Sequence, residues 1–334
     1  MGDVLLVGLG ITTATALPSL VSRCRVVGLL RKYDPNADDA VITFARRHGI
    51  PVFGDTSMAG LRRAMDELHP DCVVISSFDR IVQADLLARC PFVNVHYAPL
   101  PQYRGRANVN WAIINGESHT AITIHRVDPG LDSGNVLFQE NVAIGPRDTV
   151  ADLYDRLNAL QLRHLGDAVA KFLDGDAGTP QSSELATYGC TRLPIDGEID
   201  WTAPTHQIDA LIRALVKPFP GAFTSFNGRR LVVWRAHVLE QPPAYVGRVP
   251  GRVVNVSRAE GHVDVLTGDG VLRVLEVEVD EGQPVAAADV IRTVRGTLGL
   301  RIGDLLTRIE ALEREIAQLR ERLNPREELC AKIR

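Results

Sequence analysis

The sequence predicts an α/β protein with a parallel sheet, followed by a small antiparallel barrel and a C-terminal coiled-coil helix. Three observations predict this order. Short apolar runs alternate with helical stretches in the first half of the chain, strands separated by turn signals follow, and a heptad repeat ends the chain. The 334 residues are enough for two domains, or for one domain with appendages.

The first half contains apolar runs that are typical of buried strands. Each run is short and nearly continuous, and a segment with helical spacing of apolar residues separates it from the next. This alternation indicates a Rossmann-like parallel sheet covered by helices on both faces. A long amphipathic helix is expected over 148–175, where Gly175 ends it. The predicted strands are residues 4–10, 25–30, 51–53, 71–77 and 92–96, with a further strand at 121–127.

Short strands with turn signals begin at about residue 213. Asn227-Gly228 is a strong hairpin signal, and Gly268-Asp269-Gly270 marks another tight turn. This pattern favours a small antiparallel barrel. We therefore expect four parts: an α/β domain over 1–185, a linker over 186–204, a barrel domain over 205–299 and a helical tail over 300–334.

The tail carries a heptad repeat with Ile mostly at the a positions and Leu at d. This choice favours a parallel two-stranded coiled coil, and the g–e′ pairs Arg308–Glu313 and Glu315–Arg320 are both attractive. We expect a homodimer, although three heptads alone give a marginal coil. The alternative is one amphipathic helix that packs on its own chain. The repeat comprises Ile302, Leu305, Ile309, Leu312, Ile316, Leu319 and Leu323.

Composition disfavours several classes of protein. The formal net charge of −4 argues against a nucleic-acid surface spread over the whole chain. No apolar run reaches about 18 residues, so we expect no membrane span. The start, MGDVLLVGLG, lacks a basic region and is typical of a first strand rather than a signal peptide. The five cysteines form no C-x-x-C pair, which favours reduced thiols, no zinc site and a cytoplasmic location.

Polar groups gather at the end of the predicted strand 92–96. Asn94 and His96 are two residues apart, so their side chains share one face of a strand. Ligands of parallel sheets bind beyond the carboxyl ends of the strands. Asp132, between two glycines, could orient the His96 ring and favour its charged form. These groups suit acyl transfer to an amine, because they can stabilise an oxyanion and move a proton. The chain has no G-x-S-x-G elbow, which disfavours a serine nucleophile.

The segment NVHYAPLPQYRGRANVNWAIINGESHTAITIHRVDPGLDSGNVL, residues 94–137, resembles the signature of folate-dependent formyltransferases. That pattern contains Asn-x-His, Leu-Pro with Arg-Gly, a Trp-Ala-Ile-like segment, Gly-Glu, Thr-x-His and a closing Asp-Ser-Gly. RALVKPFPGAF, residues 213–223, resembles the start of the small OB-like barrel of longer members. The similarity covers about residues 4–300 and excludes the tail. One departure is YAPLP at 97–101, where members often read Ser-Leu-Leu-Pro, so no acceptor contact is carried over from that serine.

The resemblance implies an enzyme that takes a formyl group from N10-formyltetrahydrofolate, without a metal. Asn94, His96 and Asp132 stand on the family's three catalytic positions. Asn94 and His96 would stabilise the tetrahedral oxyanion, and Asp132 would hold His96 and help to move the amine proton toward N10. Backbone groups of residues 80–82 would contact the edge of the pterin. The residues implied to bind the folate are Phe78, Arg80, Ile81, Val82, Arg106, Asp128, Gly130 and Leu131.

The turn GLGITT at 8–13 follows the first strand and could cradle a phosphate. It lacks the full dinucleotide fingerprint, and the second strand ends in LLRKYD rather than at an acid, so nicotinamide binding is disfavoured. In a formyltransferase the turn would lie near the acceptor, with Arg31 and Lys32 as possible helpers. His125 is predicted to be a packed strand residue rather than a second catalyst. The expected acceptor contacts are Gly10, Thr12, Tyr97 and Arg104.

Three classes of acceptor amine are open: a nucleotide-linked amino sugar, methionyl-tRNA, or another small or carrier-bound amine. Residues 205–298 hold 11 Lys or Arg and 10 Asp or Glu, a net charge of +1, and the loop 32–41 is acidic. Both points disfavour tRNA, because phosphate contacts dominate its binding. RGRANVNWAIINGE resembles the UDP-amino-arabinose formyltransferase domain and sugar N-formyltransferases, which are often dimers. The prediction is therefore a small-molecule amino-sugar acceptor and no nucleic-acid partner.

Two alternatives of another class remain: a formyltetrahydrofolate hydrolase and a binding module without activity. The barrel argues for a second substrate, which a hydrolase would not need. The intact Asn94, His96 and Asp132 argue against an inactive module.

Overall fold

The computed structural model describes residues 1–33, 39–300 and 302–331. The acidic loop 32–41 and the helical tail therefore lie partly outside the described residues, as do the side chains of Ile302 and Leu323. The chain forms two compact units, which we describe separately. The N-terminal unit comprises 1–196 and 213–220, and the C-terminal unit comprises 197–212 and 221–334.

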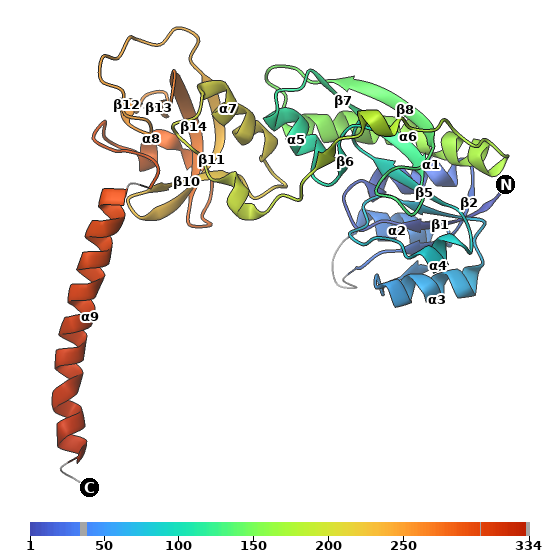
Figure 1. Cartoon of the computed structure of the whole chain (residues 1–334), viewed down its shortest axis with the longest axis horizontal. Coiled ribbons are helices and arrows are strands. Elements are labelled where there is room, and N and C mark those ends of the chain that lie inside the picture. Colours follow the sequence, from blue (N-terminus) through green and yellow to red (C-terminus); the bar gives the residue numbers. More distant parts are fainter. Residues whose placement is uncertain (34–38, 301, 332–334) are drawn as a thin grey trace. The chain divides into compact units, whose positions relative to one another are not determined.

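The N-terminal unit contains a seven-stranded sheet in the order β3-β2-β1-β4-β5-β7-β8. Its strands β1, β2, β5, β7 and β8 are labelled in Figure 1. The first five strands in this order pair in parallel, which confirms the predicted Rossmann-like sheet. The other two pair antiparallel, β7 with β5 and β8 with β7, and correct a fully parallel assignment. The strands are β1 (Asp3–Val7), β2 (Arg25–Leu30), β3 (Val52–Phe53), β4 (Cys72–Ile75), β5 (Phe92–His96), β7 (His119–Arg126) and β8 (Val136–Ala143).

Helices cover both faces of this sheet, because alternate strand residues point to opposite sides. Val4 and Leu6 of β1 belong to one core cluster, which also contains residues of α1, α2 and α6. Leu5 and Val7 belong to a second cluster, with residues of α3 and α4. The helices are α1 (Thr13–Val21), α2 (Ala40–Arg47), α3 (Met58–Leu68), α4 (Ala84–Leu87), α5 (Asn108–Ile114) and α6 (Val150–Leu173), with 3-10 turns at η1 (Ser183–Leu185) and η2 (Pro194–Gly197).

A short ladder ties the loop after β5 to a distant part of the chain. Strand β6 (Arg104–Gly105) pairs in parallel with β9 (Tyr188–Gly189). The Arg104 amide also donates to the carbonyl of Thr187 (2.8 Å). Residues 104–105 are therefore held by a segment that follows them by more than 80 positions.

The C-terminal unit contains an antiparallel sheet in the order β10-β11-β14-β13-β12, with β15 paired to β14. Asn227 and Gly228 both have positive φ, 52° and 73°, as a two-residue type I′ hairpin requires. The antiparallel sheet is confirmed; its closure into an OB-like barrel stays a prediction. The elements are β10 (Ala222–Phe226), β11 (Arg229–Val238), β12 (Val253–Ser257), β13 (His262–Leu266), β14 (Val271–Val279), β15 (Val285–Ala286), α7 (Thr205–Ala214) and α8 (Ala287–Val290).

The last element is α9 (Ile302–Ala331), a single continuous helix that carries the heptad repeat. Its apolar repeat residues with described side chains are 39–51% exposed, so the stripe is not covered within this chain. We call Leu305, Ile309, Leu312, Ile316 and Leu319 the seam. Within the described ranges, no helix is both long and apolar enough to cross a membrane.

Candidate active site

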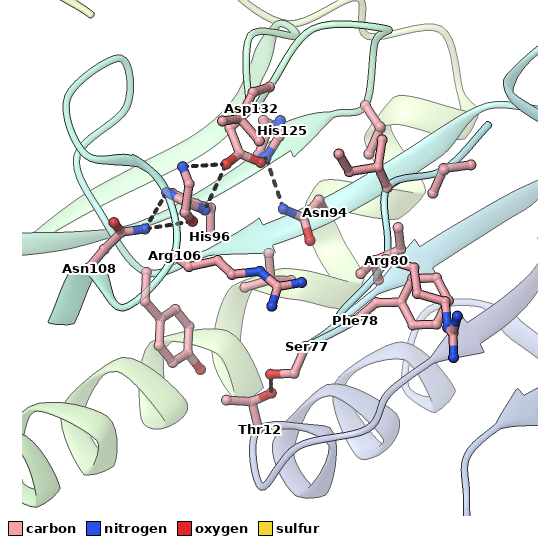
Figure 2. Close-up of a pocket in the computed structure, with 18 of the residues that line it drawn as sticks. Thr12, Ser77, Phe78, Arg80, Asn94, His96, Arg106, Asn108, His125 and Asp132 are labelled. Carbon is pink, nitrogen blue, oxygen red and sulfur yellow. Dashed lines mark hydrogen bonds and ion pairs between the residues drawn. The ribbon is translucent and has the colours of Figure 1, made fainter. Parts of the chain in front are cut away.

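A cavity of about 290 Å³ opens in the N-terminal unit, at the carboxyl ends of β1, β4 and β5. The strand order reverses between β1 and β4, and ligands of open α/β sheets bind at such a switch point. Thr12 lies on the loop after β1 and Ser77 follows β4, and their hydroxyls contact each other (2.9 Å). Figure 2 shows these two side chains on one wall and the polar group around His96 on the other.

The three residues predicted to be catalytic all line this cavity. Asn94 and His96 come from the end of β5, and Asp132 comes from the loop between β7 and β8. His96 Nδ1 lies 3.7 Å from Asp132 Oδ2, an ion-pair separation rather than a hydrogen bond. The same oxygen accepts a hydrogen bond from the Gly105 amide (2.8 Å). The sequence-based expectation that the imidazole and the carboxylate meet beside the amide therefore agrees with the geometry (Figure 2).

The ring of His125 fixes the orientation of the Asn94 side-chain amide. The two residues face each other across the β5–β7 ladder, and Asn94 Nδ2 donates to His125 Nε2 (3.1 Å). The other ring nitrogen, Nδ1, lies 2.9 Å from the carbonyl of Arg126, to which it donates. Burial and the neighbouring His96 lower the pKa of His125 to about 4, although Asp132 opposes this shift. His125 is therefore neutral near pH 7, and its Nε2 lone pair accepts from the Asn94 amide.

The loop segments around His96 have an unusual backbone. Tyr103, Ala107 and Asp132 have positive φ angles of 57°, 59° and 49°, a region that L-residues other than glycine rarely adopt. Between the first two, Gly105 has φ 98°, and a Cβ there would lie 2.8 Å from the Gly189 carbonyl oxygen. Such conformations persist where the surrounding structure imposes them, and they cluster at functional sites.

The residues predicted to bind the folate lie together. All eight line the cavity: Phe78, Arg80, Ile81, Val82, Arg106, Asp128, Gly130 and Leu131. Phe78, Val82 and Leu131 contribute apolar surface, while the Arg106 guanidinium donates to the carbonyl of Asp79. In the part of the chain that the structure describes, the backbone amides of residues 80–82 donate to no other protein group. A pocket that combines apolar side chains with free backbone donors fits the flat, polar-edged pterin of a folate.

The predicted acceptor contacts are only partly brought together. Thr12 and Tyr97 line the cavity. Arg104 is buried and donates to Gln181 Oε1 (2.8 Å) instead, and Gly10 is not a lining residue. Arg31 Nη1 donates to the Gly8 and Gly10 carbonyls (3.1 and 3.2 Å), so it braces the turn rather than projecting toward a ligand.

Three residues that the sequence did not single out, Asn108, Tyr154 and Gln161, also line the cavity. Asn108 and His125 contact His96 and Asn94 directly, as Figure 2 shows. Tyr97, Tyr154 and Gln161 line the wall near Thr12. Burial raises the pKa of Tyr97 above its usual range, and its hydroxyl donates to Asn158 Oδ1 (2.7 Å). Among the residues that the structure describes, no group of His, Cys, Asp and Glu is arranged to hold a metal ion.

Two matches to protein families cover most of the chain. Residues 41–169 match the formyl transferase family, and residues 194–295 match its C-terminal domain.

Similar curated proteins are methionyl-tRNA formyltransferases. The protein of Caldanaerobacter subterraneus subsp. tengcongensis is 36% identical over 64% of this chain and 68% of its own length. That of Symbiobacterium thermophilum is 36% identical over 82% of this chain and 83% of its own length. Three further relatives with the same name are 31–33% identical.

Solved structures show the same fold at low identity. The N-formyltransferase from Helicobacter canadensis, in complex with folinic acid and dTDP-3-aminofucose, has a TM-score of 0.62 and 18% identity. The match covers 82% of this chain and 98% of that protein.

Proposed function

Because this chain belongs to the formyltransferase family and uses N10-formyltetrahydrofolate as formyl donor, we propose that its acceptor is the amine of methionyl-tRNA. The observation that carries this proposal is the agreement among five curated relatives, which are all methionyl-tRNA formyltransferases at 31–36% identity.

The predicted amino-sugar acceptor is wrong, and so is the prediction that nucleic acid is not a partner. The same five relatives overturn both. The sequence argument used the net charge of +1 over residues 205–298. That number sums over a whole domain, whereas phosphate recognition needs only a local group of cations and is compatible with acidic residues elsewhere. The likeness to sugar N-formyltransferase structures, at 18% identity or below, concerns the fold alone.

The mechanism we propose uses the three side chains at the end of β5 and in the β7–β8 loop. The donor supplies the formyl group. The unprotonated amine attacks the formyl carbon, a new C–N bond forms, and the bond from that carbon to N10 breaks. The Asn94 amide, which His125 holds in one orientation, donates to the developing oxyanion, and the adjacent His96 ring stabilises the same charge electrostatically. Asp132 keeps the His96 ring in place and helps the amine proton reach N10.

A direct assay tests the acceptor. The purified chain is incubated with N10-formyltetrahydrofolate and, in separate reactions, methionyl-tRNA, a dTDP-linked amino sugar, or no amine. We expect formylmethionyl-tRNA together with an equal amount of tetrahydrofolate. Release of tetrahydrofolate without an amine would indicate a hydrolase and contradict the proposal. Formylation of the sugar but not of methionyl-tRNA would also contradict it.

We further propose that α9 forms a parallel two-stranded coiled coil with a second copy of the chain. The five seam residues are 39–51% exposed over about two heptads, which leaves their apolar surface without cover in a single chain. Charge complementarity points to a second copy, because Arg308 would face Glu313 of the partner subunit and Glu315 would face Arg320 of the partner subunit. Ile at a and Leu at d favour two strands.

Sedimentation of the full chain over a range of concentrations tests this coil. The double variant Ile309→Lys with Ile316→Lys should be monomeric where the unchanged chain is dimeric, since it places charge in the seam. Thr307→Lys with Gln318→Lys adds the same charge outside the seam and should remain dimeric. A chain that is monomeric at every concentration, or a seam variant that still dimerises, would contradict the coiled coil.

A further inference from the structure

The Nε2 atom of His96, on the rear side of the ring away from Asp132, lies beside one group that can only accept a hydrogen bond and one that can only donate. Nε2 lies 2.8 Å from the Tyr103 carbonyl oxygen and 3.0 Å from Asn108 Nδ2. A carbonyl oxygen can only accept, so it requires an N–H on Nε2. An amide nitrogen can only donate, so it requires a lone pair there. Nε2 therefore satisfies one of these partners at a time.

The orientation of the Asn108 amide is set by a third group. Nδ2 also donates to the Gly105 carbonyl oxygen (3.0 Å). If the amide were flipped, its oxygen would face that carbonyl oxygen, and two acceptors cannot form a hydrogen bond. One amide hydrogen therefore points to Gly105 and the other to His96. Asn108 is only 8% exposed, so water does not compete freely for these hydrogens.

Two glycines shape the backbone around this side chain. Gly105 presents its carbonyl from a left-handed conformation, φ 98°. A Cβ at Gly189 would lie 2.5 Å from Asn108 Oδ1. Asn108 itself is the first residue of α5 and follows Ala107, which has φ 59°. The local backbone is thus shaped so that the amide reaches the back of the imidazole.

We propose that Asn108 is a positioning residue that sets the tautomer of His96. By donating to Nε2, it places the proton of the neutral ring on Nδ1, the nitrogen that faces Asp132 at 3.7 Å. In a doubly protonated ring, Nε2–H would donate to the Tyr103 carbonyl oxygen, which is the acceptor of the two rear groups. The two rear partners therefore serve the two charge states in turn, and the front nitrogen carries its N–H toward Asp132 in both.

This role rests on the proposed function only for its effect on rate. Without Asn108, the Tyr103 carbonyl has no competitor, and the neutral ring carries its proton on Nε2. Nδ1 then presents a lone pair to the Asp132 carboxylate, which cannot orient it. A wrong tautomer lowers kcat even when the geometry is intact.

Nitrogen NMR of the full chain labelled with ¹⁵N-histidine reads the tautomer directly, with the His96 signals assigned by their loss in His96→Gln. In the unchanged protein we expect neutral His96 to be protonated on Nδ1, and in Asn108→Ala on Nε2. Asp132 and His125, the titratable groups that face the ring, are unchanged in all these variants.

Kinetics complete the test. In Asn108→Ala, kcat for formyl transfer should fall about tenfold or more, while KM for the folate donor stays near its original value. The same tautomer in the unchanged chain and in Asn108→Ala would overturn the inference. So would a variant whose only defect is a raised KM. The NMR result needs no acceptor, so an enzyme that shows the tautomer change but ignores methionyl-tRNA would refute the proposed function and leave this inference intact.

Discussion

The loop around His96 and the helix α9 differ in what fixes their geometry. Residues 103–108 include two left-handed residues besides glycine, and individual atoms of this loop contact His96 and Asp132. Helix α9 is regular along its whole length, and its seam repeats one kind of apolar contact. In the loop, catalytic geometry depends on contacts of individual atoms. In the helix neighbouring residues can substitute for one another.

This difference teaches that chemistry and assembly should be separable in the same chain. Changes in the loop should alter catalysis without altering dimerisation, and changes in the seam should do the reverse. The following predictions test that separation, starting with the largest effect.

Removing the imidazole should cause the greatest loss. His96→Ala and Asp132→Ala are each expected to lower kcat by about 10²- to 10⁴-fold, the usual contribution of a positioned acid or base. Sedimentation should show an unchanged dimer. The control is His48→Ala, since His48 is exposed and, among the described residues, its side chain contacts the Phe44 carbonyl and ring and no group of the cavity. Either variant with a near-normal rate would remove the catalytic roles proposed here.

The buried imidazole behind Asn94 should make stability depend on pH. The pKa of His125 is about 4 in the fold against 6.5 when unperturbed, because burial and His96 disfavour its charged form. As pH falls, the unfolded chain therefore binds a proton on His125 before the folded chain does. Because of this group, the free energy of unfolding falls by about 3 kcal/mol between pH 6.5 and 4.

Urea unfolding at several pH values measures this effect. In His125→Gln the loss of stability between pH 6.5 and 4 should be smaller than in the unchanged chain by about that amount. The charged residues of α9 whose side chains the structure describes are exposed and should add no comparable dependence. Parallel curves for the two proteins would show that His125 is not held neutral.

Gly105→Ala should disturb the loop more than a similar change elsewhere. A side chain at this position would strain the backbone at its φ of 98°. The new Cβ would also lie 2.8 Å from the Gly189 carbonyl oxygen. We expect a loss of about 1–3 kcal/mol in stability and a clear fall in kcat, as the Asp132 contact moves. Gly116→Ala is the matched control, because Gly116 has φ 70° but no atom within 4 Å of the added Cβ. The Gly116→Ala variant should be less stable than the unchanged chain but should have the same kcat.

The smallest expected effect concerns the charges beside the seam. Glu313→Arg would place two arginines together in a parallel pair and weaken dimerisation by about 1 kcal/mol or less. Adding Arg308→Glu to the same chain should restore the affinity, since the pair is then reversed. Sedimentation at low salt measures both. If the double variant stays weak, the helices do not pair in parallel.

The sequence predicted well those parts that depend on local patterns. The runs that became β2 and β5 were predicted with their observed bounds, since each is a nearly continuous apolar segment. The strand β8 was missed. Its residues are mostly half-buried or exposed on the edge of the sheet, so it lacks such a run. Its antiparallel pairing with β7 was therefore not anticipated either.

The residues of the candidate site also divide into those that local sequence patterns predict and those that depend on contacts between distant segments. Asn94 and His96 could be predicted from their spacing on one strand, and Asp132 from its motif. His125 was assigned to packing, because its contact with Asn94 depends on the register between β5 and β7. Asn108 reaches His96 only through a loop with several left-handed residues, and no residue spacing predicts such a path. The acceptor was mispredicted because net charge does not report local charge.

The β6–β9 ladder has a consequence for where this protein can be cut. A fragment that ends at residue 185, the boundary suggested by the sequence, would lack Thr187, Tyr188 and Gly189, which hold the backbone of Arg104 and Gly105. It would also lack the Cys190 carbonyl that accepts from the Trp111 indole (2.8 Å). A version of the N-terminal unit that folds alone must therefore extend past residue 190. A shorter fragment would contain every chemical group of the cavity, but the segment behind the imidazole would lack the strand that pairs with it.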